Sequence, residues 1–474
     1  MTDLPRDDTS HFIHRLSFDA LPDPVVQDAK RRVLDLLGVA AAGSGTALAR
    51  IVREHASDCF GAGRMPARML FDGRAVSPPG AALAGATIID SFDGHDGHAL
   101  TKGHAGVTVL PALLAMTDVR PAMSGREFLT QIVLGYELGT RAGIALHATS
   151  REYHTSGAWN ALAAAALVSR SLKLGIEATR HALGIAEYHG PRSDMMRCID
   201  HPTMVKDGSG WGAMAGVSAG LLAARGYTGA PATTVETAAP ECWADLGTRW
   251  RILEQYLKPY PVCRWAHPAI AAALYVRNLP GFDAEAIEHA TIHTFHEATR
   301  LWSAPPANTE EAQYGVLFPV AAALANGRVD ADTIDAAGLT DPRVLALVSR
   351  LDAVEHDTFN AAFPAERWAR LTVRMRDGQQ FDSGPMQAPG DPDRPMTAEA
   401  ERDKFRSLVG ARFGDALATS IETAVDELSD PHGTVERLQS LVLCAPSIDA
   451  GTRPYVSRSA SRDASDRQAI TSLS

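Results

Sequence analysis

Apolar residues recur at the spacing of an α-helix along the first half of the chain. The clearest run, residues 25–42, leads into a Gly-Ser-Gly sequence that is typical of a helix end. The same spacing predicts further helices at residues 111–118, 125–148, 157–174 and 209–226. In the last of these, glycine recurs every fourth residue from Gly212 to Gly220. Because glycine weakens a helix, this face is expected to pack closely against another helix or a ligand.

The pattern changes after residue 285. Alternating polar and apolar residues predict a strand at 290–297, and residues 371–382 predict a hairpin that turns at Asp377-Gly378. A loop rich in Pro, Gly and Asp follows up to residue 396. Helical spacing then returns at residues 398–416 and 418–444.

At 474 residues, the chain exceeds what one hydrophobic core usually serves. We therefore predict a mainly α-helical protein with a smaller α+β domain, and C-terminal helices that rejoin the large helical domain. The predicted boundaries are residues 1–265 for the first part of the helical domain, 266–397 for the α+β domain and 398–445 for the C-terminal helices. Residues 446–474 are polar and Ser-rich, so this tail is predicted to be disordered.

Composition and charge narrow the class of protein. Hydrophobic residues make up 45% and charged residues 21%, as in ordinary globular proteins, and the net charge of −11 argues against a nucleic-acid partner. The five cysteines include no Cys-x-x-Cys pair, which argues against a disulfide framework or a zinc ribbon and fits a cytoplasmic protein. Neither a signal peptide nor an apolar run of about 18 residues is found, so no membrane partner is expected.

Residues 90–111 combine four glycines with seven ionisable residues between two apolar segments. The ionisable residues are Asp90, Asp93, His95, Asp96, His98, Lys102 and His104. Charged groups are costly to bury unless they are paired or used, so this segment predicts the wall of a cavity. Three interpretations stay open: a metal site, since imidazole and carboxylate suit zinc, iron or manganese; a metal-free catalytic or anion-binding loop; and a solvated loop that caps a helix.

Three other segments place cations or imidazoles at junctions between loops and helices. They contain His154, Lys206, and the group Lys258, Arg264 and His267. At the N-terminus of the Ala-rich helix, His154 could help to bind an anion, although plain capping by Thr155 or Ser156 explains the turn equally well. Lone Lys and Arg residues are usually solvated, whereas together these residues offer a polycarboxylate several fixed cations. No phosphate-loop, dinucleotide-binding or nucleophile-elbow motif accompanies them.

Six segments, in this order, resemble the MmgE/PrpD family, which includes 2-methylcitrate dehydratase, cis-aconitate decarboxylase and iminodisuccinate epimerase. They are residues 32–38, 93–111, the turn at His154, 206–229, 258–267 and 305–313. The resemblance extends over about residues 10–445. It implies a large helical domain, a smaller α+β lid domain, an active site between the two, and usually a homodimer.

The resemblance also implies roles for single residues. The positions that match its active-site motifs, expected to be catalytic, are Asp93, His104, His154, Lys206 and Lys258. The residues expected to bind the substrate beside them are His95, His98, Lys102, Arg264, His267 and Tyr314. No metal ligand and no cofactor are expected.

The chain departs from the family pattern at several of these positions. Gly97 stands where the family has Thr, and Ala105-Gly106 follows His104 where the family has Pro-Ser. Phe318 stands at the position of a late Tyr, although Tyr314 is one helical turn away. The two additional imidazoles of the loop, those of His95 and His98, are a further departure.

The family reactions share proton transfer at a carbon atom next to a carboxylate. We predict a cofactor-independent lyase of the hydratase or dehydratase type that acts on a small di- or tricarboxylate. In this hypothesis His104 and His154 transfer protons, Asp93 orients one of them, and Lys206, Lys258 and Arg264 bind the carboxylates. The alternatives are an isomerase or epimerase of a dicarboxylate such as iminodisuccinate, a cis-aconitate-type decarboxylase and, from other classes, a metal-dependent hydrolase or a non-catalytic carboxylate-binding protein.

Overall fold

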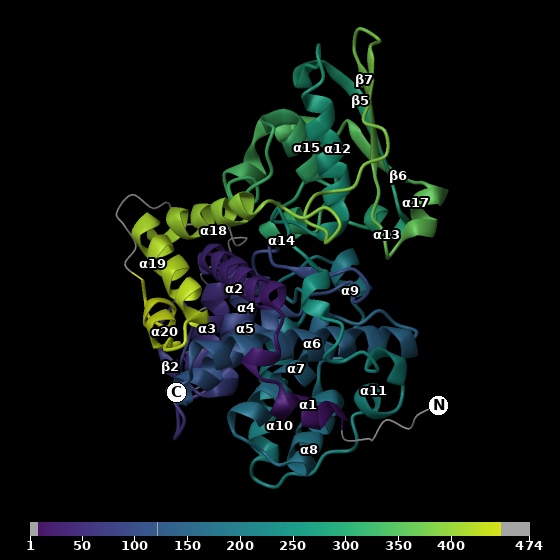
Figure 1. The fold of residues 1–474 in the computed structure, drawn as a ribbon. Coiled ribbons are helices and arrows are strands. Elements are labelled where there is room, and N and C mark those ends of the chain that lie inside the picture. Colours follow the sequence, from purple (N-terminus) through teal and green to yellow (C-terminus); the bar gives the residue numbers. More distant parts are fainter. Residues whose placement is uncertain (1–7, 121, 447–474) are drawn as a thin grey trace, which may run out of the picture.

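The computed structural model describes residues 8–120 and 122–446. Helices form a large lower body, and a smaller upper part with a four-stranded sheet stands on top of it (Figure 1). The predicted fold class, mainly α with a smaller α+β part, is confirmed. Nearly all of the tail that was predicted to be disordered lies outside the described residues, which end at 446.

The lower body contains the helices of the first half of the chain. They are α1 (Asp8–Arg15), α2 (Asp23–Gly43), α3 (Ala47–Cys59), α4 (Pro78–Asp90), α5 (Gly106–Val119), α6 (Gly125–Thr149), α7 (Ser156–Ser171), α8 (Ile176–His189), α9 (Met196–Asp200), α10 (Ser209–Ala223) and α11 (Thr233–Glu236). The helices predicted at residues 25–42, 125–148, 157–174 and 209–226 are confirmed as α2, α6, α7 and α10.

Helix α5 begins at Gly106, five residues before the predicted start at Pro111. Proline favours the first turn of a helix because it has no N–H to donate, so its place inside a helix needs an explanation. In the structure Pro111 lies inside the helix, packed against Gly85 of α4. A Cβ atom at Gly85 would stand 2.9 Å from Cβ of Pro111, so this glycine provides the space for the ring.

The glycine face of α10 packs against α7, as the pattern predicts. A Cβ atom at Gly212 would stand 2.4 Å from the carbonyl oxygen of Gly157, and one at Gly216 would stand 2.2 Å from that of Ala161. At Gly220 the neighbour is the side chain of Val168. Only glycine permits this approach of two backbones, which fixes the loop that precedes α10.

The upper part contains short helices and the sheet. They are α12 (His267–Arg277), α13 (His296–Thr299), α14 (Thr309–Gln313), α15 (Leu317–Asn326), α16 (Pro342–Val348), α17 (Asp357–Ala362), β5 (Ile287–Thr294), β6 (Leu351–Glu355), β7 (Arg370–Met375) and β8 (Gln380–Asp382). The strand order is β6-β5-β7-β8, with β5 and β6 parallel and the other neighbours antiparallel. The predicted hairpin is confirmed as β7 and β8, with Val373 opposite Phe381. The predicted strand is confirmed as β5, which ends earlier because α13 begins at His296.

The C-terminal helices return to the lower body (Figure 1). They are α18 (Ala398–Phe413), α19 (Asp415–Asp426) and α20 (Glu436–Val442), and α18 packs against α2, where Phe405 lies on Gly38. The helix predicted at residues 418–444 is wrong as one element, because Pro431 and Gly433 separate α19 from α20. The residue boundaries predicted for the domains stay predictions.

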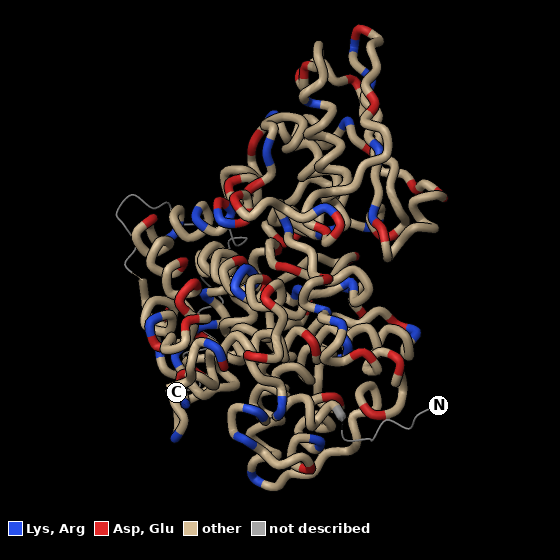
Figure 2. The backbone as a smooth tube through the Cα atoms, viewed as in Figure 1, with Lys and Arg blue, Asp and Glu red and all other residues tan. Residues whose placement is uncertain are grey.

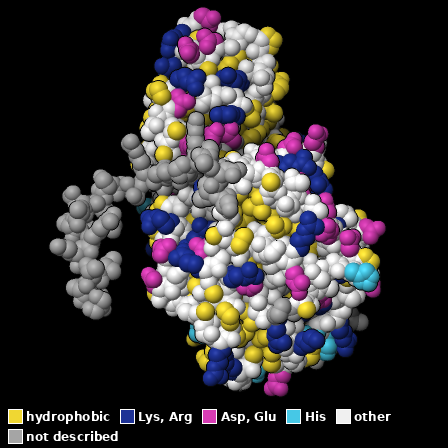
Figure 3. Space-filling view, turned by 90° about the vertical axis from the view of Figure 1, so that its left-hand side faces the viewer, with side chains coloured by type: hydrophobic (Ala, Val, Ile, Leu, Met, Phe, Trp, Pro, Cys, Tyr) yellow, Lys and Arg dark blue, Asp and Glu magenta, His cyan; other side chains and the backbone are white. Residues whose placement is uncertain are grey.

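Acidic and basic residues are mixed along the backbone of both parts (Figure 2), and they are also interspersed on the face shown in Figure 3. Among the described residues, no single helix is both long and apolar enough to cross a membrane. Helices α2 and α3 reach that length and apolar content only when taken together, and they are bent by 93° at their junction.

Candidate active site

The segment between α4 and α5, here called the polar loop (residues 91–105), is mostly buried. Its strand β3 (Gly97–His98) pairs antiparallel with β4 (Gln255–Tyr256), which brings the loop next to the segment around Lys258. Asp93 is 3% exposed and His95 is 0% exposed. This burial excludes the interpretation of the segment as a solvated capping loop.

Helices from both ends of the chain hold the polar loop. Lys404 of α18 has its Nζ 2.5 Å from Oδ1 of Asp35 on α2, and it donates to the carbonyl oxygen of Gly94 at 2.7 Å. Tyr136 of α6 donates to Oδ2 of Asp96 at 2.5 Å. Burial raises the pKa of Asp96 to about 6. The loop is therefore fixed by contacts that lie far from it in the sequence.

Asp93 and Lys258 form a buried ion pair in the loop. Nζ of Lys258 lies 2.5 Å from Oδ1 of Asp93 and 3.3 Å from its carbonyl oxygen. Burial alone would raise the pKa of Asp93, but the ammonium groups of Lys258 and Lys206 hold this pKa well below its usual value. The carboxylate is therefore charged at any pH at which the protein works, and it is available to orient a neighbouring group.

Gln313 of α14 connects the upper part to the same loop. Its Oε1 accepts hydrogen bonds from Nζ of Lys206 at 2.8 Å and from the backbone N–H of Asp93 at 2.9 Å. Nζ of Lys206 also lies 4.6 Å from the centre of the Tyr314 ring. Lys206 has a φ of 49°, a left-handed conformation that side chains rarely adopt and that often marks a functional position.

His104 is held as a neutral imidazole. Its Nδ1 lies 2.5 Å from the carbonyl oxygen of Asp96, so Nδ1 carries the proton and Nε2 is free to accept one. Its backbone N–H donates to Oγ of Ser156 at 2.9 Å, and Asn160 donates to its carbonyl oxygen at 2.5 Å. Burial, together with His95 and Lys258, lowers the pKa of His104 well below its usual value.

These groups surround a small cavity of about 20 Å³. The expected residues that line it are Asp93, Lys102, His104, Lys258, Arg264 and Tyr314. The sequence analysis did not find Tyr153, Tyr256, Cys263 and Arg367, which also line it. Arg264 forms an ion pair with Asp391, because its Nη2 lies 2.8 Å from Oδ2 of that residue. Arg367 belongs to the upper part, where no local pattern marks it as a site residue.

His154 is not brought to this cavity. Its Nε2 lies 3.1 Å from Oγ of Ser150, and its backbone N–H faces Nε2 of His147. His154 forms an isolated β-bridge with Asp194, and in such extended backbone adjacent side chains point to opposite sides. Tyr153, the preceding residue, faces the cavity in its place.

His98 and His267 also lie outside the cavity lining. Nε2 of His98 lies 3.2 Å from a carboxylate oxygen of Glu254, and its Nδ1 accepts from the backbone N–H of Leu100. Nδ1 of His267 lies 3.3 Å from Nη1 of Arg264, and its Nε2 lies 3.0 Å from the carbonyl oxygen of Val262. Both imidazoles therefore support neighbouring groups from behind the cavity.

His95 lies behind His104, with the centres of the two rings 4.3 Å apart. Asp93, His95 and His104 each offer a ligand atom within 4.8 Å of the others, which is the geometry closest to the metal site considered above. The ammonium of Lys258, however, already occupies the Asp93 carboxylate at 2.5 Å. A divalent ion would have to displace this cation, so the donor set fits a metal poorly.

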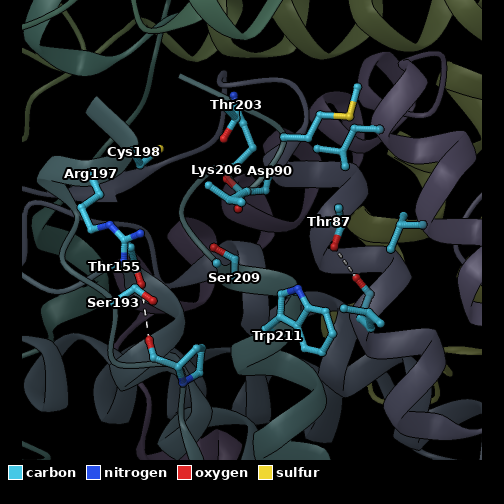
Figure 4. Close-up of a pocket in the computed structure, with 18 of the residues that line it drawn as sticks. Thr87, Asp90, Thr155, Ser193, Arg197, Cys198, Thr203, Lys206, Ser209 and Trp211 are labelled. Carbon is cyan, nitrogen blue, oxygen red and sulfur yellow. Dashed lines mark hydrogen bonds between the residues drawn. The ribbon is translucent and has the colours of Figure 1, made fainter. Parts of the chain in front are cut away.

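A separate, larger groove of about 790 Å³ lies at the start of α10 (Figure 4). Asp90, Lys206 and Ser209 line it together with apolar residues such as Trp211, which is partly exposed. Lys206 thus borders the groove and also bonds to Gln313 beside Asp93. The groove is also lined by ionisable residues, namely His55, Asp90, Asp194, Arg197, His201 and Lys206. The small cavity, and not the groove, is lined by Asp93, His104 and Lys258.

Two family models match the chain on either side of this cavity. The MmgE/PrpD N-terminal domain matches residues 7–243, and the MmgE/PrpD C-terminal domain matches residues 260–430. The chain belongs to the MmgE/PrpD family. The family predicted from the sequence motifs is therefore confirmed.

Relatives of this MmgE/PrpD chain align over most of its length. A cis-aconitate decarboxylase-like protein of Aspergillus oryzae is 24% identical over 91% of this chain and 96% of its own. The cis-aconitate decarboxylase of Aspergillus terreus is 22% identical over 90% and 94%, respectively. The cis-aconitate decarboxylase of Mus musculus is 24% identical over 88% and 89%.

The structure explains two departures from the MmgE/PrpD pattern. A Cβ atom at Gly97 would stand 2.5 Å from Oη of Tyr256 and 2.6 Å from Nδ1 of His104, so Thr has no room at this position. A Cβ atom at Gly106 would stand 2.1 Å from Oη of Tyr136, the residue that holds Asp96. At these two positions, tyrosines from other elements fill the space that a side chain of the loop would need.

Proposed function

We propose that the chain is a lyase that acts on a small tricarboxylate or dicarboxylate by proton transfer at a carbon atom next to a carboxylate. The observation that carries the proposal is the small cavity that joins neutral His104 to the Asp93–Lys258 pair among several cations. The names of the relatives support a lyase on a substrate of this class.

His104 is the proposed base. Its Nδ1 proton is engaged by the carbonyl oxygen of Asp96, so Nε2 is the atom that takes the substrate proton. Asp93, charged and close to His104, stabilises the imidazolium that forms. No other imidazole among residues 8–120 and 122–446 lines this cavity.

The cations are proposed to bind the substrate carboxylates and the negative charge that develops in the transition state. Lys258 and Arg264 line the cavity from the segment after β4, and Lys102 lines it from the polar loop. Fixed donors in a site without bulk water are worth more than the same donors in solution. Lys258 and Tyr256 can also donate to a leaving hydroxyl group.

Dehydration is the reaction that a neutral imidazole favours, because dehydration begins with removal of a proton. Decarboxylation needs a proton delivered to carbon after carbon dioxide leaves, so His104 would first have to be charged. The relatives nevertheless keep a cis-aconitate-type decarboxylase as the second candidate. An epimerase needs bases on both faces of the carbon, and neither His98 nor His154 reaches the cavity lining.

Entry of the substrate requires the cavity to open. A cavity of about 20 Å³ has room for water but not for a di- or tricarboxylate. Tyr314 and Arg367 line the cavity from the upper part, whereas Asp93 and His104 belong to the lower body. Separation of these two groups of residues is therefore the proposed route of entry.

The proposal is tested by incubating the protein with 2-methylcitrate, cis-aconitate, citrate and iminodisuccinate in heavy water. NMR and mass spectrometry would follow deuterium uptake, loss of water and loss of carbon dioxide. We expect deuterium uptake or product with at least one compound, and its loss in the His104→Asn variant. Absence of both signals for all four compounds, with a folded protein, would contradict the proposal. The homodimer and the cytoplasmic location stay predictions.

A further inference from the structure

Arg367 is a buried guanidinium without an acidic partner. It lies three residues before β7, is 4% exposed and lines the small cavity. No carboxylate of the described residues lies within ion-pair distance of it, in contrast to Arg264, which pairs with Asp391. Its Nε is buried without a hydrogen-bond partner. A buried charge left in this state is costly unless another molecule pairs with it.

The few contacts that Arg367 makes hold it at the cavity without neutralising it. Nη2 donates to the carbonyl oxygen of Ala99 in the polar loop at 3.3 Å. The guanidinium carbon lies 5.5 Å from the centre of the Tyr256 ring, and that of Arg264 lies 5.0 Å from the same ring. Tyr256 thus fixes two guanidinium groups at one wall of the cavity.

Lys102 is a second positively charged residue near Arg367. Lys102 lines the same cavity, and its Nζ lies 4.2 Å from the centre of the Tyr153 ring. Burial lowers the pKa of Lys102, and the positive charge of Arg367 lowers it further, although Glu297 acts in the opposite direction. Like Lys206, Lys102 has a φ of 49° and so holds a rarely adopted backbone conformation.

We infer that Arg367 binds a carboxylate of the substrate, beside Lys102 and apart from the Asp93–Lys258 pair. The inference rests on the proposed function and deepens it, because it assigns one carboxylate of the substrate to a residue of the upper part. A guanidinium presents paired N–H groups that match a carboxylate. Arg367 is thus a specificity-determining residue that favours substrates with a carboxylate remote from the reacting carbon.

The test compares Arg367→Gln and Arg367→Lys with Arg370→Gln as the matched control. Arg370, three residues further on, is partly exposed and pairs with Asp382. Each variant would be measured for its Tm without ligand, for the rise in Tm with citrate or cis-aconitate, and for kcat and KM. For Arg367→Gln we expect an unchanged or higher Tm without ligand, because an unpaired buried charge is removed. The rise in Tm should disappear and KM should increase roughly 10- to 100-fold, the usual worth of a hydrogen bond to a charged group.

Arg367→Lys should restore part of the affinity, and Arg370→Gln should leave both ligand readouts unchanged. A lower Tm of Arg367→Gln without ligand, combined with an unchanged KM and ligand-induced shift, would overturn the inference and assign Arg367 a structural role. Stabilisation of the wild type by carboxylates without turnover would contradict the proposed lyase only. In that case loss of the shift in Arg367→Gln would still support the binding role. If no carboxylate stabilises the wild type, both are overturned.

Discussion

The carbonyl oxygen of Asp96 lies 2.5 Å from Nδ1 of His104, and this contact fixes which nitrogen of the imidazole faces the substrate. The N–H at Nδ1 of His104 donates to this carbonyl oxygen, so Nε2 is left as the basic nitrogen. We expect His104→Asn, which keeps a donor near Asp96, to reduce kcat by about 100- to 10,000-fold, the usual range for a general base. Circular dichroism and thermal unfolding would confirm that the variant is folded.

His154→Asn, compared with His104→Asn, tests whether His154 takes part in catalysis. The family resemblance implies a catalytic role for His154, whereas the structure places its side chain against Ser150, outside the cavity. On the structural argument kcat/KM should change less than about 10-fold, because no reacting group is removed. A loss as large as that of His104→Asn would reinstate the catalytic role and contradict the geometry described above.

The pH dependence of activity and of stability should differ. The pKa of His104 is lowered well below its usual value of about 6.5 by burial, His95 and Lys258, so the base stays neutral in the folded protein. We therefore expect kcat/KM to show no loss through His104 as the pH falls from about 7.5 to about 6. A fall of kcat/KM with an apparent pKa near 6.5, absent from His104→Asn, would contradict this.

Stability, in contrast, should fall below about pH 6.5. The unfolded chain then takes up a proton on His104 that the native chain does not bind, so the free energy of unfolding decreases as the pH falls. The slope contributed by one such imidazole approaches about 1.4 kcal/mol per pH unit. His267, whose pKa is also lowered, mainly by burial, acts in the same direction. Denaturant titrations at several pH values should show a shallower slope in His104→Asn than in the wild type.

Gly97→Thr, which installs the residue of the family pattern, should inactivate this chain. The new Cβ would stand 2.5 Å from Oη of Tyr256 and 2.6 Å from Nδ1 of His104, so one of these side chains must move. Overpacking of a buried site costs about 1–3 kcal/mol, and displacement of His104 would reduce kcat further. Gly61→Ala is the control, because a Cβ there meets no atom within 4 Å. Unimpaired activity of Gly97→Thr would show that Tyr256 moves without cost.

Lys404→Met should destabilise the protein and loosen the polar loop. The substitution leaves the buried Asp35 carboxylate without its partner at 2.5 Å and removes the donor to the carbonyl oxygen of Gly94. Breaking a buried pair on one side costs about 3–5 kcal/mol. The double variant Asp35→Asn/Lys404→Met should recover part of this loss in urea denaturation, since no unpaired charge remains. A Lys404→Met variant as stable as the wild type would show that the pair is dispensable.

Local patterns predicted what is local in this molecule. The helical period identified α2, α6, α7 and α10, and the glycine face of α10 predicted its packing, because both depend on residues within one element. The start of α5 was missed because it depends on Gly85 of another helix, which makes room for Pro111. The prediction of a single helix at residues 418–444 did not take into account the break at Pro431 and Gly433.

The candidate site likewise combines features that local sequence predicted with features that depend on tertiary contacts. The density of ionisable residues around Asp93 and His104 marked the loop, since burying so many charges demands a use. Arg367 and Gln313 could not be found in this way, because no dense cluster of ionisable residues surrounds either one and only tertiary contacts bring them to the polar loop and its cavity. The direction of the His154 side chain could not be predicted either, because adjacent side chains of an extended segment point to opposite sides.

The contact from Lys404 to Gly94 has a consequence for how the enzyme is made. Lys404 is synthesised about three hundred residues after the loop that it holds, so a chain still attached to the ribosome can fold its first helices but lacks this anchor. The polar loop therefore lacks the hydrogen bond from Lys404 to Gly94 until α18 has emerged from the ribosome. The complete site can therefore form only after α18 has been synthesised.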